Sequence, residues 1–139
     1  MKLLSGGLSA VIVVGFLAGR TSVASTSCET LASLSLKDAT ITAASTVAAG
    51  AFRPPAAGPS GGEEFKSLAS FCRVSATLRP SPDSDIKVEV WLPSAGWNGK
   101  FQAVGNGGWA GTIGYGAMAR ALAQGYATRS EERRVGKEC

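Results

Sequence analysis

A run of residues near the end of the chain, Lys100-Phe-Gln-Ala-Val-Gly-Asn-Gly-Gly-Trp-Ala-Gly111, limits the folds that are open to it. Its first part, Phe101 to Val104, reads as a short apolar strand, and a glycine cluster that includes Gly108 follows at once. Glycine has no Cβ, so such a turn can adopt positive φ and bring backbone N–H groups close to a ligand oxygen. Where a helix follows, the turn is a place to bind negative charge. The charge is either a phosphate or the oxyanion that forms when an ester carbonyl is attacked.

Two strands are predicted before this cluster. Segments 72–79 and 86–92 alternate between apolar and polar side chains, which is typical of half-buried strands. Pro80-Ser-Pro-Asp-Ser84 between them is turn chemistry, so the strands should pair as an antiparallel hairpin. The alternation places Val88 on one face of the second strand and Trp91 on the other. Further upstream, Ala39-Thr-Ile-Thr42 suggests a short β segment.

A helix and a last strand are predicted after the cluster. Tyr115, Met118, Ala119 and Leu122 recur at helical spacing, and Gly125 is placed to end the helix. Tyr126-Ala-Thr128 then begins a strand. Hairpin, strand, glycine loop, helix and strand together predict the opening of an α/β sheet, antiparallel at its edge and parallel after a right-handed crossover.

Gly50 to Gly62 holds three prolines and further glycines and predicts an irregular surface loop.

Residues 1–24 predict a secretory signal peptide. Lys2 precedes an apolar core, Leu8 to Ala18, and Ser22-Val-Ala24 supplies the small residues of a cleavage site. A transmembrane anchor is the alternative, but the apolar run is short for a hydrocarbon core of ~30 Å and ends at Arg20. We therefore expect a secreted or periplasmic protein that has no membrane contact after cleavage.

Residues 129–139, Arg-Ser-Glu-Glu-Arg-Arg-Val-Gly-Lys-Glu-Cys, differ abruptly in composition from the rest of the chain. With one choice of codons they back-translate to a common sequencing adapter, so we predict that they are not native and exclude them from the domain, which is 25–128. A solvated charged helix or a basic nucleic-acid tail are the alternatives. Without both ends, the chain carries eight basic and seven acidic side chains, which favours no nucleic-acid partner.

Two cysteines remain when Cys139 is set aside. Cys28 and Cys72 are an even pair in an exported chain, which favours a disulfide. Metal binding is the rival, but two cysteines in a chain without histidine make a poor site.

The glycine cluster allows three interpretations. Residues 105–110 fit the dinucleotide pattern G-x-G-x-x-G/A, but the helix does not begin at once, and no acidic residue lies near 20 positions onward outside the suspect tail. The oxyanion interpretation fits better, because one oxyanion donor of α/β-hydrolases lies in the loop between the third strand and the first helix. A purely structural glycine turn stays open.

The sequence resembles the N-terminal part of the tannase and feruloyl esterase family. Trp97-Asn-Gly-Lys-Phe101 followed by Gly105-Asn-Gly-Gly-Trp-Ala-Gly111 carries the resemblance. Cys28-Glu-Thr-Leu, Phe71-Cys-Arg-Val and Val88-Glu-Val-Trp-Leu-Pro93 fit the same pattern in the same order, and the resemblance covers about 28–128.

The resemblance implies a secreted serine esterase with an α/β-hydrolase core, a large lid domain and a Ser-Asp-His triad. By the same resemblance, Gly108 contributes a backbone N–H to the oxyanion hole, and Cys28 and Cys72 match an N-terminal disulfide. The chain has no histidine, no G-x-S-x-G elbow and no lid with its calcium-binding loop. The predicted fold is therefore the N-terminal part of an α/β-hydrolase sheet, truncated before the nucleophile elbow and the lid.

Two functions follow as hypotheses. The first is an N-terminal fragment of a secreted serine carboxylic ester hydrolase that acts on aromatic, phenolic esters. The fragment itself is expected to be inactive and to hold no cofactor, with calcium only in the missing lid and a small aromatic ester as the partner of the full-length parent. The alternative is a small secreted binding module, with Trp91, Trp97 and Trp109 as an exposed ligand platform.

Overall fold

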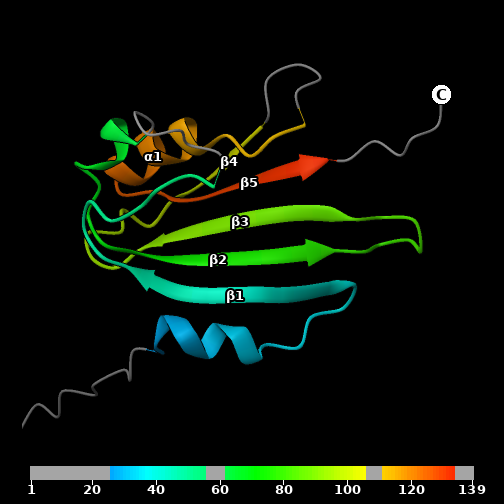
Figure 1. The fold of residues 1–139 in the computed structure, drawn as a ribbon. Helices are drawn as coiled ribbons and strands as arrows, with labels where there is room; N and C mark the ends of the chain where they lie inside the picture. Colours follow the sequence, from blue (N-terminus) through cyan, green and yellow to red (C-terminus); the bar gives the residue numbers. More distant parts are fainter. Residues whose placement is uncertain (1–25, 56–61, 106–110, 134–139) are drawn as a thin grey trace, which may run out of the picture.

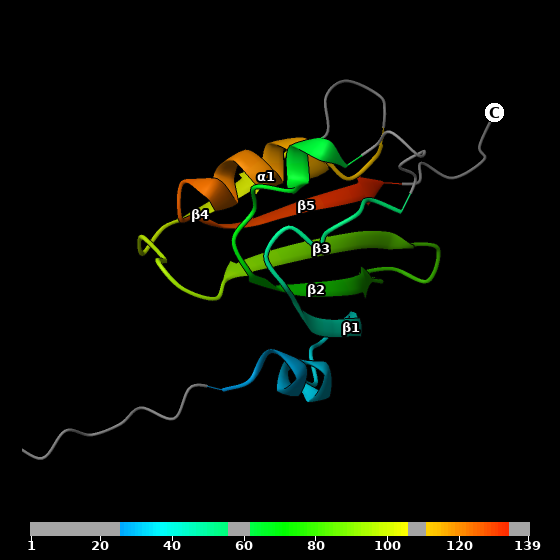
Figure 2. The ribbon, with the colours of Figure 1, turned by 60° about the vertical axis from the view of Figure 1, so that its left-hand side comes forward.

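The protein forms one mixed sheet with a helix packed on one face. The computed structural model describes residues 26–55, 62–105 and 111–133. The five strands lie in the order β1-β2-β3-β5-β4. Figure 2 shows helix α1 and the short 3₁₀ helix η2 on one face, with the 3₁₀ helix η1 beside β1 at the other end of the sheet. In chain order the elements are η1 (Cys28–Ser33), β1 (Ala39–Val47), η2 (Glu63–Phe65), β2 (Phe71–Leu78), β3 (Ile86–Pro93), β4 (Phe101–Val104), α1 (Tyr115–Ala123) and β5 (Ala127–Arg133).

The predicted hairpin is confirmed. Strands β2 and β3 pair antiparallel in an unbroken register in which Leu78 lies opposite Ile86 and Arg73 opposite Trp91. Strand β1 adds to the free edge of β2 (Figure 1) and is longer than the predicted segment 39–42, because its backbone continues the antiparallel pairing past a register shift.

The strand–loop–helix–strand unit is also confirmed. Strand β4 has the predicted bounds, and β5 pairs parallel to it, with Ala127 opposite Phe101. The helix ends as expected at Gly125, which has φ +78°. The amide of Gly125 donates to the carbonyl of Leu122 at 2.9 Å and that of Tyr126 to Ala121 at 3.1 Å, the paired bonds of a Schellman ending.

Strand β5 does not stop at Thr128, where the sequence predicts that the tail cuts it off. It runs on to Arg133 and pairs with β3, with Glu131 opposite Val88. The physical reason is that β3 presents a row of backbone N–H and C=O groups along this edge, and an extended segment of almost any sequence can pair with it. The foreign origin of residues 129–139 stays a prediction, and residues 134–139 lie outside the described part of the chain.

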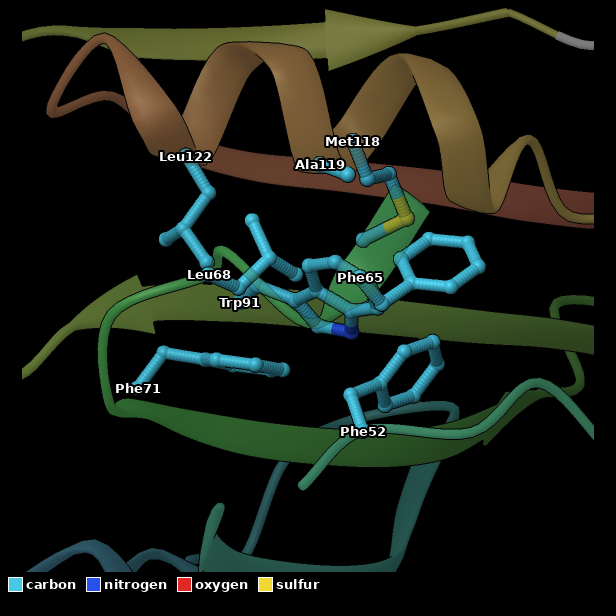
Figure 3. Close-up of a cluster of buried hydrophobic side chains, with 8 residues drawn as sticks. All are labelled: Phe52, Phe65, Leu68, Phe71, Trp91, Met118, Ala119 and Leu122. Carbon is cyan, nitrogen blue, oxygen red and sulfur yellow. The ribbon is translucent and has the colours of Figure 1, made fainter. Parts of the chain in front are cut away.

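The core lies between α1 and the sheet (Figure 3). Trp91 is fully buried there, so its assignment to an exposed platform is wrong. Helix α1 covers the face of β3 that carries Trp91. The alternation alone does not determine which of the two faces is covered. Trp97 is 61% exposed, and Trp109 lies outside the described residues. The buried cluster comprises Phe52, Phe65, Leu68, Phe71, Trp91, Met118, Ala119 and Leu122.

The loop predicted at 50–62 is not only a surface excursion. Phe52 from this loop is 3% exposed, and its ring centroid lies 4.6 Å from that of Trp91 and 5.1 Å from that of Phe65. The loop therefore supplies part of the cover of the sheet. Residues 56–61 lie outside the described part.

The disulfide predicted between Cys28 and Cys72 is present, with Cα atoms 5.5 Å apart. It ties η1 to the N-terminal end of β2. Within the residues that the structure describes, none of the helices has the length and apolar character needed to cross a membrane.

Candidate functional site

The glycine cluster lies between β4 and α1, as the sequence predicts. Gly105 follows the last residue of β4, and Gly111 has φ +59°, a conformation that favours glycine. Residues 106–110, which include Gly108, lie outside the described residues. The oxyanion role of the Gly108 amide therefore stays a prediction, and the geometry that follows concerns the two ends of the loop.

The two ends of the loop meet at one point of the sheet. A Cβ built on Gly114 would lie 3.8 Å from the carbonyl oxygen of Gly105 and 3.4 Å from Cγ1 of Val104. The chain thus leaves β4 and returns beside it before α1 begins. The amide of Gly114 also donates to the hydroxyl of Ser130 on β5 at 3.0 Å, and Ser130 is buried.

The first turn of α1 carries no negative charge of its own. Its N-cap is Gly114, no side chain caps its amides, and no Asp or Glu lies in its first turn. The helix dipole gives such an end a partial positive charge, which favours an anionic group nearby, and the carboxylate oxygens of Glu64 already lie 3.5 and 3.8 Å from a Cβ built on Gly116. This end of α1 is the one that the glycine cluster enters, so the described residues are compatible with an oxyanion-binding turn.

A buried polar network lies beneath this end of the helix. The carboxylate of Glu89 on β3 is paired with the guanidinium of Arg73 on β2, with Arg73 Nε donating to Glu89 Oε2 at 2.8 Å and Arg73 Nη2 donating to Glu89 Oε1. Trp91 Nε1 donates to Oε2 at 3.0 Å, and the hydroxyl of Tyr115, the first residue of α1, donates to Oε1 at 3.0 Å. The carboxylate therefore joins two strands and the helix.

The environment of the network raises the pKa of two of its members, Tyr115 and Arg73. Burial, and next the negative charge of Glu89, raises the pKa of Tyr115 to about 12. The hydrogen bond to Glu89 raises the pKa of Arg73, against the opposing effect of burial. Tyr115 accordingly stays a hydrogen-bond donor at all moderately alkaline pH values.

The Trp97-Asn98-Gly99 turn has a structural task at the other end of α1. The amide of Asn98 donates to the carbonyl of Gly125 at 3.0 Å, and its side-chain Nδ2 donates to the carbonyl of Gln124 at 2.8 Å. Trp97 Nε1 donates to the carbonyl of Lys100 at 3.0 Å. This part of the motif fastens the loop before β4 to the C-terminal end of α1.

Sequence reasoning identified the loop but missed the network. The alternation marks Glu89 and Arg73 only as polar members of two strands, although opposite charges at neighbouring positions of a hairpin face are a recognisable signal. Among the described residues, no group of three or more Cys, Asp or Glu side chains is placed to hold a metal ion.

The sheet is similar to part of a solved esterase structure. The crystal structure of feruloyl esterase B from Aspergillus oryzae is similar, with a TM-score of 0.64 and 33% identity, and the match covers 76% of this chain and 20% of that one. The fold is therefore the N-terminal part of an α/β-hydrolase-like sheet, as predicted.

Sequence comparison finds a similarity to one family over part of the chain. Residues 72–133 match the family model described as tannase and feruloyl esterase, which confirms the predicted resemblance over this segment. An uncharacterized esterase of Xanthomonas campestris pv. campestris is 44% identical over 112 residues, which is 81% of this chain and 19% of the relative. A probable feruloyl esterase B-1 of Neosartorya fischeri is 37% identical over 78 residues, 56% of this chain and 14% of the relative. The chain thus spans about a fifth or less of the length of these proteins.

Proposed function

We propose that the chain is the N-terminal part of a secreted serine carboxylic ester hydrolase that acts on aromatic, phenolic esters. The observation that carries the proposal is the coincidence of two findings on one segment. Residues 72–133 match the tannase and feruloyl esterase model, and the same residues form the hairpin, β4, the turn into α1 and β5.

The chemistry assigned to this segment is oxyanion stabilisation. A serine beyond the chain attacks the ester carbonyl, a histidine takes the proton of the serine, and the amide of Gly108 binds the oxygen that becomes negative. One such donor is worth ~3–4 kcal/mol of transition-state stabilisation. The first turn of α1, which contains no acidic residue, supports this role, because the helix dipole places a partial positive charge where the loop enters the helix.

The substrate class and the location of the parent are part of the proposal. The aromatic ester comes from the named activity of the similar feruloyl esterases, and export comes from the predicted signal peptide at 1–24 and the Cys28–Cys72 disulfide. Calcium is proposed only for the lid of the parent, and the nearly balanced charge of 25–128 favours no nucleic-acid partner.

The test begins with the genomic DNA past codon 128. We expect several hundred further in-frame codons that encode a nucleophile elbow, and the full-length product should hydrolyse methyl esters of hydroxycinnamic or gallic acid faster than an aliphatic methyl ester. The present chain, assayed beside it, should show no hydrolysis above background, since it lacks the nucleophile and the base. A stop codon shortly after codon 128, or a full-length product without esterase activity, would contradict the proposal.

The binding module is not favoured. Its platform required three exposed tryptophans, and Trp91 is fully buried in the core.

A further inference from the structure

Glu89 is the one acidic side chain that the described core buries, and its surroundings are unusually complete. Its side chain is 5% exposed, in the middle of β3, where the sheet faces α1. Each of its two oxygens accepts from Arg73 and from one further donor, Trp91 on Oε2 and Tyr115 on Oε1. A carboxylate buried in this way is tolerated only because all its contacts are made, and losing one partner is costly.

The partners of Glu89 differ in what they join. Arg73 and Trp91 belong to the sheet, so their bonds hold the carboxylate in place. Tyr115 is the first residue of α1, and its ring also packs against Phe52, with centroids 5.5 Å apart. The bond from the Tyr115 hydroxyl therefore transmits the fixed position of the carboxylate to the start of the helix.

We propose that Glu89 is a positioning residue that acts through Tyr115 to fix the first turn of α1, and the segment 111–114 that leads into it, against the sheet. The inference rests on the proposed function, in which the turn entering α1 must hold a backbone donor at a defined place. Displacements of about 1 Å in such a site can cost up to a hundredfold in rate. Ser130 also bonds Gly114, but it lies in the segment predicted to be foreign, whereas Glu89 and Tyr115 do not.

The test is Tyr115→Phe in the full-length protein. This change removes one hydroxyl and keeps the ring that packs on Phe52. We expect kcat to fall at least about fivefold with KM changed less than about twofold, because the substrate still binds while the donor is displaced. Tyr126→Phe, a matched change in the tyrosine just past the C-terminal end of α1, should leave kcat unchanged.

A second measurement does not depend on activity. Amide hydrogen exchange of the segment 111–118, followed by mass spectrometry, should be at least about fivefold faster in Tyr115→Phe than in Tyr126→Phe. Unchanged exchange in this segment would overturn the positioning role. An unchanged kcat in Tyr115→Phe, with only a lower melting temperature, would overturn it as well, because that result describes a purely structural bond.

The two proposals fail in different ways. If the unaltered full-length protein hydrolyses no aromatic ester, the proposed function fails, and the exchange of segment 111–118 still decides whether Tyr115 holds the start of α1. If the unaltered protein is active and Tyr115→Phe matches it in both readouts, the positioning role alone is wrong.

Discussion

Replacing Gly125 by alanine should destabilise the C-terminal end of α1 by more than the positive φ of Gly125 alone would cost. Gly125 has φ +78°, and a non-glycine residue in this left-handed region costs about 1 kcal/mol. A Cβ at this position would also lie 2.7 Å from the backbone carbonyl oxygen of Gly96, so the turn before β4 must move. Such overpacking costs a further ~1–3 kcal/mol. The expected loss of local stability is therefore about 2–4 kcal/mol.

Gly99→Ala is a matched control. Gly99 has the same φ as Gly125, +78°, and lies with Gly96 in the turn before β4. A Cβ built on Gly99 meets nothing within 4 Å. This variant should lose only the conformational part, about 1 kcal/mol. The difference between the two variants isolates the contact with Gly96.

Hydrogen exchange of the segment 115–126 in the full-length protein measures both losses as local opening free energies. Since 1.4 kcal/mol is a factor of ten, protection should fall about fivefold in Gly99→Ala and at least about thirtyfold in Gly125→Ala. Equal losses in the two variants would refute the steric reasoning. A larger loss in Gly99→Ala would show that the turn, and not the helix ending, is the fragile part.

Four further outcomes are expected. The raised pKa of Tyr115, about 12 in the folded chain against an ordinary 10.0, gives stability that is complete below pH 10 and lost as pH rises through 12, so urea unfolding at these pH values should separate the unaltered protein from Tyr115→Phe. Reduction of the Cys28–Cys72 disulfide, with a sequence separation of 44, should lower the unfolding free energy by up to about 4 kcal/mol, and both thiols should resist labelling before reduction. Phe52→Ala should cost about 3–5 kcal/mol in a thermal melt, and a loss below about 1 kcal/mol would show that the 50–55 loop is not part of the core. Residues 25–128 alone should associate at high concentration and show no esterase activity, because β4 offers an unpaired edge; a sharply melting monomer would contradict this.

The local pattern of the sequence was sufficient for the elements that obey one period. The hairpin and helix α1 follow from alternation and helical spacing, strand β4 is placed by the glycines that follow it, and the helix ending follows from Gly125. These features depend on neighbours within a few residues, which is the range that periodicity reports.

The contributions of distant segments could not be predicted in this way. Phe52 lies in a stretch rich in proline and glycine, which predicts irregular backbone and says nothing of whether a side chain returns to the core. Strand β4 lies at the edge of the sheet, and Phe101 on it is 55% exposed, whereas the sequence does not show which of its edges is paired. Its place in the order depends on which strands pair with it, and those lie far along the chain or in the remaining four fifths of the relatives' length.

Part of the buried network can be predicted from the pairing register of the hairpin. A hairpin that pairs Leu78 with Ile86 places Ser75 opposite Glu89 and Arg73 opposite Trp91. Arg73 and Glu89 are then diagonal neighbours on one face, within reach of two long side chains. Two opposite charges and an indole N–H on one face can satisfy one another, so that face can be buried although its pattern is polar. The element that covers this face must supply one further hydrogen-bond donor to Glu89. In the structure that donor is the hydroxyl of Tyr115, at the start of the predicted helix.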